Sequence, residues 1–203
     1  MRSLEYRFGC WCALTAFVGG AGYSIAQLLQ IAGLLRWPWD EILIYAFSFI
    51  IAWPFMLAML ALNRVTPEAR KIWSGAGLLF AVIYATYVTL MYPVQLGTAI
   101  PLRLQGNANS LYAVDRYSLF WAIDGLGYIC MGLATLFAAH AFSGPVWVRR
   151  FFLANGCFTA VITLVYFYPV FSTGLLLIAS PWIVTGPGSF LALALWFARK
   201  QGA

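Results

Sequence analysis

Charged residues are scarce in this chain. Only 9% of its 203 residues are charged, whereas 63% are hydrophobic. Globular proteins carry about 25% charged residues, so this composition excludes a soluble domain and favours a chain that lies in a bilayer. No charge run or Ser/Gly linker interrupts the sequence. We therefore expect one transmembrane domain over residues 1–203 and no separate soluble catalytic domain.

Metal-binding and redox residues are also few. The chain has one histidine, His140, and four cysteines, of which Cys10 and Cys12 are separated by one residue. That spacing is neither a redox pair nor half of a zinc site. We expect free thiols, no metal and no cofactor.

Basic residues outnumber acidic ones by twelve to six, yet they are scattered as ones and twos at the ends of apolar runs. A nucleic-acid-binding surface would gather them into a patch. The sequence therefore predicts no nucleic-acid partner, and the lipid bilayer is the expected environment.

Six apolar stretches are long enough, or nearly so, for the roughly 20 residues that a membrane-crossing helix needs. They predict an all-α, polytopic transmembrane bundle of six helices, at about residues 8–35, 41–62, 72–92, 117–142, 151–168 and 174–198.

The basic residues also predict an orientation. With the N-terminus inside, nine of them are cytoplasmic and three are outside, the latter being Arg36, Arg103 and Arg116. Lys and Arg near span ends favour the cytoplasmic side. We expect an N-in, C-in protein of the cell's inner (plasma) membrane, with both termini cytoplasmic.

Two segments depart from simple helical spans. The outer loop, residues 93–116, is far longer than the other connections, and its mixture of Pro, Asn, Gln and apolar residues suggests a surface-lying or partly re-entrant cap. A solvated loop that only spans a distance is the alternative. In the sixth span, Pro181 and Pro187 with flanking glycines predict a bent or broken helix near residues 185–188.

Asp124 is the only acidic residue well inside a predicted span. At about 1.5 Å rise per residue it lies roughly 10 Å below the start of its helix, in the outer half of the membrane. A carboxylate at such a depth needs a partner, water or a proton. Asp124 is therefore the candidate functional residue.

Polar and aromatic side chains gather at the same outer depth on the inward faces of several spans. They predict a cavity that opens outward, with Asp124 in its wall and the outer loop above it. Interhelical hydrogen bonds without any ligand are the alternative. The expected ligand-binding residues are Gln27, Gln30, Tyr92, Gln95, Trp121, Asp124, Tyr128, Thr163, Tyr166 and Trp182.

The run Ser118-Leu-Phe-Trp-Ala-Ile-Asp124-Gly-Leu-Gly-Tyr128, followed further on by Arg150-Phe-Phe-Leu-Ala-Asn155-Gly156, resembles a group of uncharacterised bacterial multi-span membrane proteins. The resemblance covers the fourth and fifth spans and implies no known activity. It includes Asp124 in the shared pattern.

Three functions fit these observations. The first is binding or transport of a small, partly apolar molecule, amphiphilic or lipophilic, around Asp124. The second is an intramembrane enzyme, such as an isomerase, cyclase or transferase of a lipidic substrate, with Asp124 as general acid or base. The third is a non-catalytic subunit that packs against a membrane partner or a second copy of the chain.

Overall fold

Six helices, each long and apolar enough to cross a membrane, make up the fold. The computed structural model describes residues 2–107, 109–143 and 146–201, and no strand occurs among them. The predicted all-α bundle of six helices is confirmed. Its elements are α1 (Arg2–Ile31), α2 (Trp39–Val65), α3 (Lys71–Val94) with its extension α4 (Ile100–Leu104), α5 (Leu119–Ala138), α6 (Trp147–Phe167), and α7 (Thr173–Ala179) followed by α8 (Trp182–Gln201).

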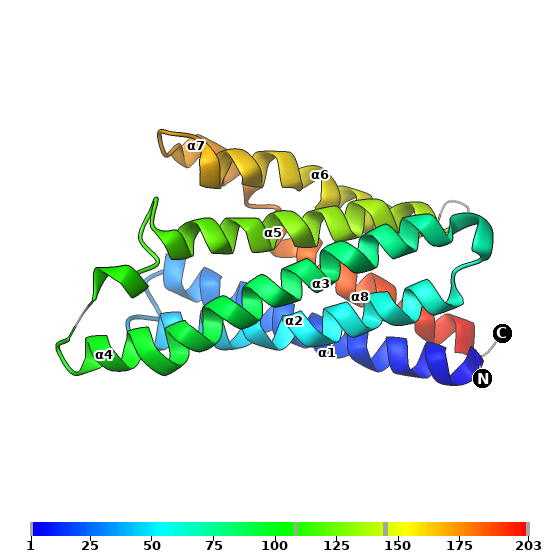
Figure 1. Ribbon diagram of the computed structural model, residues 1–203, viewed down its shortest axis with the longest axis horizontal. Coiled ribbons are helices and arrows are strands. Elements are labelled where there is room, and N and C mark those ends of the chain that lie inside the picture. Colours follow the sequence, from blue (N-terminus) through cyan, green and yellow to red (C-terminus); the bar gives the residue numbers. More distant parts are fainter. Residues whose placement is uncertain (1, 108, 144–145, 202–203) are drawn as a thin grey trace.

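The helices close into a ring. α2 packs against α1 and α3, α5 packs against α3 and α6, and α8 packs against α6 and α1. Successive helices are thus neighbours, and the last returns to the first. α1 begins and α8 ends at one end of the ring, which we call the termini end, whereas α4 and the connection to α5 lie at the opposite loop end (Figure 1).

Helix α1 shows how the faces of the ring divide between lipid and protein. Trp11, Val18 and Ile25 recur every seven residues and are each more than half exposed. This stripe is apolar and suits contact with lipid tails. On the opposite face Ala16 is buried, and a Cβ on Gly20 would lie 3.2 Å from an aromatic ring of α8. Small residues on the inward face therefore let α1 and α8 approach closely.

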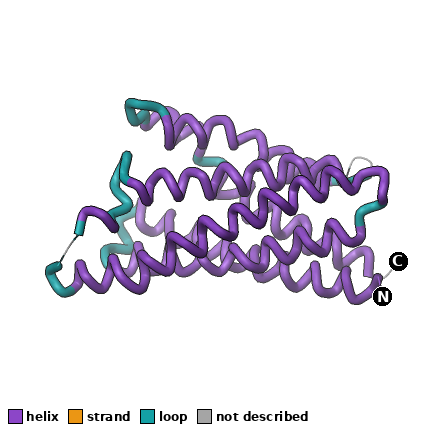
Figure 2. Tube along the Cα trace, viewed as in Figure 1, coloured by secondary structure: helices purple, strands orange, loops and turns teal. Residues whose placement is uncertain are grey.

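The third helix continues beyond the point where a loop was expected. Pro93 lies inside α3, and a π-helical turn, Gln95–Ala99, leads without a break into α4. Proline removes only one backbone donor, and a helix tolerates it where apolar packing continues, as at the buried Ile100. The connection to α5 is shortened to residues 105–118, and most of its described part, residues 105–107 and 109–118, is irregular (Figure 2). The predicted loop over 93–116 was therefore wrong in its first half.

The last span is broken, as predicted, but not at residues 185–188. The interruption lies between α7 and α8, where Pro181 follows the end of α7. Pro187 instead sits inside α8. Its missing N–H frees the carbonyl of Ile183, four residues earlier, and the Ser24 hydroxyl of α1 donates to that carbonyl at 2.8 Å. The freed acceptor is satisfied, so the helix continues through this proline.

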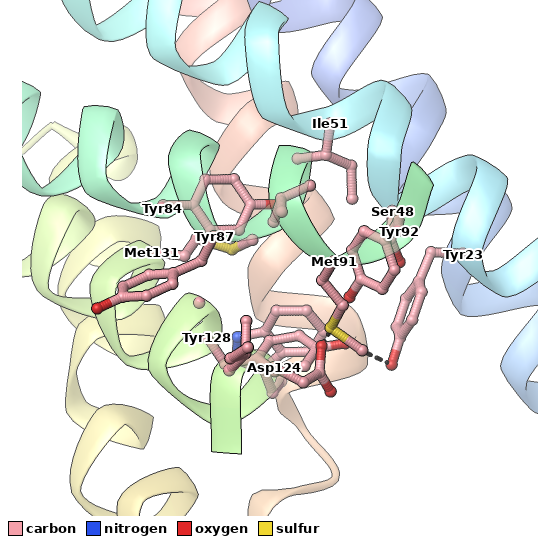
Figure 3. Close-up of a pocket in the computed structure, with 14 residues that line it drawn as sticks. Tyr23, Ser48, Ile51, Tyr84, Tyr87, Met91, Tyr92, Asp124, Tyr128 and Met131 are labelled. Atoms are coloured by element: carbon pink, nitrogen blue, oxygen red, sulfur yellow. Dashed lines mark hydrogen bonds between the residues drawn. The ribbon is translucent and has the colours of Figure 1, made fainter. Parts of the chain in front are cut away.

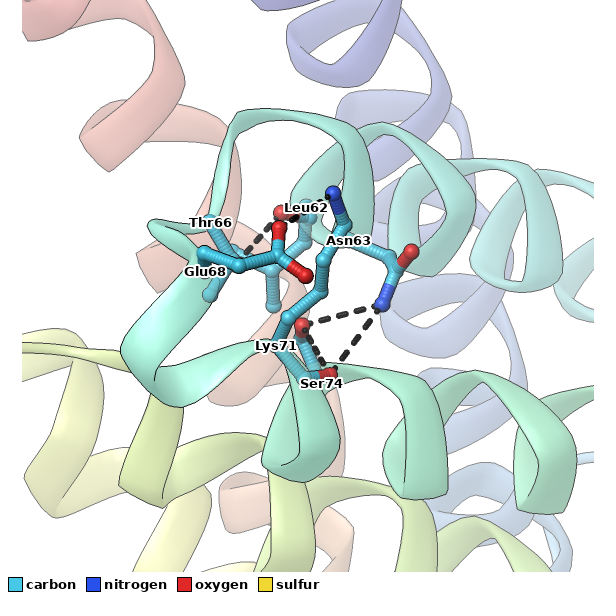
Figure 4. Close-up of polar contacts among 6 residues, drawn as sticks. All are labelled: Leu62, Asn63, Thr66, Glu68, Lys71 and Ser74. Atoms are coloured by element: carbon cyan, nitrogen blue, oxygen red, sulfur yellow. Dashed lines mark hydrogen bonds and ion pairs between the residues drawn. The ribbon is translucent and has the colours of Figure 1, made fainter.

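Side chains hold the turn between α2 and α3 at the termini end (Figure 4). Asn63 Nδ2 donates to Ser74 Oγ at 3.0 Å, and Lys71 pairs with Glu68 at 3.1 Å. This turn lies at the end of the ring opposite to α4, and its Glu68 is exposed.

Candidate functional site at the loop end

The Asp124 carboxylate lies between three helices. It projects from the second turn of α5, whose first turn is capped because Trp121 N donates to Ser118 Oγ at 3.1 Å. Tyr92 of α3 donates to Asp124 Oδ1 at 2.8 Å, and Tyr166 of α6 donates to Oδ2 at 2.7 Å. Hydrogen bonds to a charged acceptor are the stronger kind. Two tyrosine hydroxyls thus supply the partners that a carboxylate at this depth needs.

A glycine makes the approach of Tyr166 possible. A Cβ built on Gly125 would lie 2.6 Å from the Tyr166 ring, closer than real contacts allow. Trp121, one turn earlier in α5, also holds this tyrosine, since their ring centroids are 4.5 Å apart and Trp121 Nε1 donates to the Tyr166 carbonyl at 3.3 Å. Gly125 and Trp121 therefore fix the position of one of the two donors to Asp124.

Beside Asp124 is a small cavity at the centre of the ring, which we call the inner cavity (Figure 3). Its wall includes Asp124, Tyr92, Tyr23 and Tyr128 together with Trp182 of α8. Its volume is about 10 Å³, which is the least that one water molecule needs. The inner cavity is thus too small for an organic molecule in this conformation.

A chain of hydrogen bonds leads from the inner cavity towards the loop end along α1. The Tyr128 hydroxyl donates to the Tyr23 hydroxyl at 3.1 Å, and Tyr23 donates to Gln27 Oε1 at 3.3 Å. Gln27 Nε2 then donates to Gln30 Oε1 at 2.7 Å, and Gln30 Nε2 donates to Asp40 Oδ2 at 2.9 Å. The two glutamines therefore join α1 to the start of α2 and line neither cavity.

A second and much larger cavity, the outer cavity, lies at the loop end beneath the connection to α5. Its volume is about 430 Å³, within the range of about 300–1,000 Å³ typical of small-molecule sites. The first turns of α2, the extension of α3 and the connection 105–118 form its wall. The lining residues are Glu41, Tyr45, Gln95, Ala99, Leu102, Arg103, Asn109, Tyr112, Ala113, Val114 and Asp115.

Two polar contacts shape the outer cavity. Arg103 of α4 donates to both carboxylate oxygens of Glu41 in α2, at 2.9 and 2.6 Å. Gln95, 2% exposed, donates through Nε2 to the Tyr112 carbonyl at 2.9 Å. The ion pair fastens the helix extension to α2, and Gln95 fastens the connection 105–118 to the π-helical turn.

A pair of tyrosines separates the two cavities. Tyr45 lines the outer cavity and Tyr92 lines the inner one, and their rings are stacked with centroids 5.6 Å apart at 25°. The hydroxyl of Tyr92 is also a donor to Asp124. A molecule that contacts Tyr45 is therefore one ring away from the carboxylate.

The ten residues expected to bind a ligand fall into four groups. Tyr92, Asp124, Tyr128 and Trp182 line the inner cavity, whereas Gln95 lines the outer one. Trp121 and Tyr166 support Asp124 as described above. Gln27, Gln30 and Thr163 lie outside both cavities, and the Thr163 hydroxyl donates to the carbonyl of Thr159 in its own helix.

The sequence analysis missed most of the wall of the outer cavity. Glu41 and Asp115 lie at or beside the ends of predicted spans, where charged residues usually mark the membrane interface, and Arg103 lies within the predicted outer loop. Their sequence positions alone therefore gave no sign of a site. The continuation of α3 into α4 brings Arg103 to Glu41. The sequence did not predict this continuation, because Pro93 at the start of the segment suggested that the helix ends there.

Comparison with protein-family models, with curated proteins and with solved structures finds no match for this chain. Among the residues that the structure describes, no three His, Cys, Asp or Glu side chains come together as a metal site requires. The two cavities are thus the features on which a proposal of function rests.

Proposed function

We propose that this protein lies in the plasma membrane with both termini in the cytoplasm, so that the loop end faces outward. Arg36, Arg103 and Arg116 belong to the loop end, whereas the other nine basic residues belong to the termini end. An excess of Lys and Arg near span ends on one side marks the cytoplasmic side. The outer cavity then opens to the outside of the cell or to its outer leaflet.

In this orientation we propose that the protein binds a small, partly apolar molecule at the loop end. The outer cavity carries the proposal, because it has the volume of a ligand site and mixes apolar, aromatic and charged walls. The inner cavity holds no more than one water. The ligand would therefore occupy the outer cavity, with Tyr45 as its inner wall and Asp124 behind that wall.

A ligand in the outer cavity would affect Asp124 through Tyr92. A ligand that displaces the Tyr45 ring also displaces the ring stacked on it, and with it one of the two donors to Asp124. The carboxylate is thus placed to respond to occupancy of the outer cavity. Transport would require this tyrosine pair to separate, whereas binding alone would not.

The composition of the inner cavity disfavours catalysis at Asp124. Among the described residues that line it, Asp124 is the one carboxyl group and no histidine is present. General acid–base catalysis at two positions of a substrate would need a second titrating group there, and only the tyrosines, which are weak acids, could supply it.

A cavity-filling substitution tests the proposal. Ala113→Trp places a large ring in the outer cavity, and Leu111→Trp is the matched control because Leu111 belongs to the same connection, is 59% exposed and does not line the cavity. Native mass spectrometry of protein extracted gently from its own membrane should show a bound small molecule on the wild type and on Leu111→Trp, and none on Ala113→Trp. A stoichiometric protein partner without a small molecule would instead support the role of a partner subunit.

A further inference from the structure

The charges around the outer cavity are unequal. Its wall contains two carboxylates, Glu41 and Asp115, and one cation, Arg103. Glu41 and Arg103 neutralise each other through the two hydrogen bonds described above. The wall therefore keeps one formal negative charge, which belongs to Asp115.

The other cations of the loop end do not pair with Asp115. The Arg116 guanidinium lies 3.7 Å from the centroid of the Phe171 ring, and Arg36 Nε donates to the carbonyl of Gly33. Among the described residues, no Lys or Arg nitrogen lies within 4.0 Å of the Asp115 carboxylate. A cation from outside the chain can therefore approach it.

The rest of the wall suits the body of an organic cation. Tyr45 and Tyr112 offer aromatic groups, which attract cations, and Leu102 and Val114 offer apolar surface. Gln95 uses its Nε2 to hold Tyr112, and within the described part of the chain no donor reaches its Oε1. The wall thus offers an unpaired carboxylate, a free amide oxygen and aromatic groups to a cation.

We propose that the ligand of the outer cavity is a monovalent organic cation, an amine or quaternary ammonium with an apolar chain, and that Asp115 is the residue that binds its charged group. The proposal rests on the proposed function, since it names the chemical class of the molecule that the outer cavity takes. Arg103 then limits the charge of the site, because it cancels the second carboxylate.

Three probes with the same six-carbon chain test this class. Hexyltrimethylammonium, hexanol and hexyl sulfate are titrated by calorimetry into the full-length protein in nanodiscs at low ionic strength, with empty nanodiscs as the blank. Hexyltrimethylammonium should bind tightest, and its affinity should fall as salt is added, because Asp115 is exposed to solvent. Equal affinity for the three headgroups would overturn the proposal.

Three variants test whether Asp115 is the residue that binds the charged group. Asp115→Asn should weaken binding of hexyltrimethylammonium by about tenfold or more, a factor equivalent to about 1.4 kcal/mol. Glu68→Gln is the matched control, since it removes the same charge from an exposed carboxylate at the termini end and should leave binding unchanged. Arg103→Gln releases Glu41 and should tighten binding. An unchanged affinity in Asp115→Asn, or an equal loss in Glu68→Gln, would contradict the assignment.

The outcomes also separate this inference from the proposed function. If hexanol or hexyl sulfate binds as well as the cation and Ala113→Trp abolishes that binding, the outer cavity is a ligand site but not a cation site. If none of the three probes binds above the blank, the cation class fails, whereas the proposed function stands or falls with the molecule that native mass spectrometry finds on the wild type and not on Ala113→Trp.

Discussion

The contact between Gly125 and Tyr166 gives the sharpest prediction of stability. Gly125→Ala places a methyl group 2.6 Å from the Tyr166 ring, so the ring must move away from α5. Overpacking of this kind costs about 1–3 kcal/mol, and loss of the hydrogen bond to Asp124 adds about 0.6 kcal/mol, the average for membrane proteins. Alanine regains about 1 kcal/mol of helix propensity. A net destabilisation of about 0.6–2.6 kcal/mol is therefore expected.

Gly127→Ala is the matched control in the same helix. A Cβ on Gly127 would have its nearest neighbour at 3.9 Å, an ordinary contact. Only the gain in helix propensity remains, so this variant should be neutral or more stable.

The assay is thermal unfolding in detergent, followed with a thiol-reactive fluorophore that reports exposure of the buried Cys130, in a protein whose other three cysteines are replaced by alanine. Gly125→Ala should unfold at a lower temperature than the parent and Gly127→Ala should not. Equal unfolding temperatures for the two variants would refute the close packing of Tyr166 on α5.

A double-mutant cycle asks whether the Gly125 substitution acts through the hydrogen bond to Asp124. Tyr166→Phe removes the hydroxyl and keeps the ring. If the methyl group displaces that hydroxyl, then Tyr166→Phe should destabilise the parent but add little to Gly125→Ala. Fully additive effects would mean that the hydrogen bond survives the glycine substitution.

Two further predictions concern the fold. Ser24→Ala leaves the carbonyl of Ile183 without its donor, so it should destabilise the protein by about 0.6–1.7 kcal/mol in the same unfolding assay; an unchanged unfolding temperature would mean that another group satisfies this carbonyl. In a cysteine-free protein in intact cells, a cysteine introduced at Asn109 should react with a membrane-impermeant maleimide, whereas one at Glu68 should react only after the cells are opened. The reverse labelling pattern would invert the proposed orientation.

The number of helices could be predicted because each crossing is an apolar run bounded by charged or turn-forming residues. The effect of each proline on its helix could not be predicted in the same way. Pro187 was expected to disturb its helix, yet the carbonyl that it frees is satisfied by Ser24, a residue 159 positions away in the chain. At Pro187 the partner comes from another helix, and partners of this kind are visible only in the folded structure.

The candidate site was predictable in one respect. Asp124 stood out as a lone carboxylate within a span, and the helical phase placed Tyr92 and Tyr166 on inward faces at the same depth. Phase indicates that a side chain points inward, but not which other helix it meets. For that reason Gln27 and Gln30 were assigned to the ligand site, although they bond to each other and to the start of α2.

The closure of the ring also has a consequence for how the protein is made. Helices leave the ribosome in sequence, so α1 enters the bilayer first and then waits through the synthesis of the whole chain for α8, its second neighbour. Until then, the Ser24 hydroxyl lacks its acceptor in α8, and the inner cavity lacks the part of its wall that Trp182 supplies. A chain truncated before its last crossing would leave these polar groups of α1 and α5 without the helix that covers them.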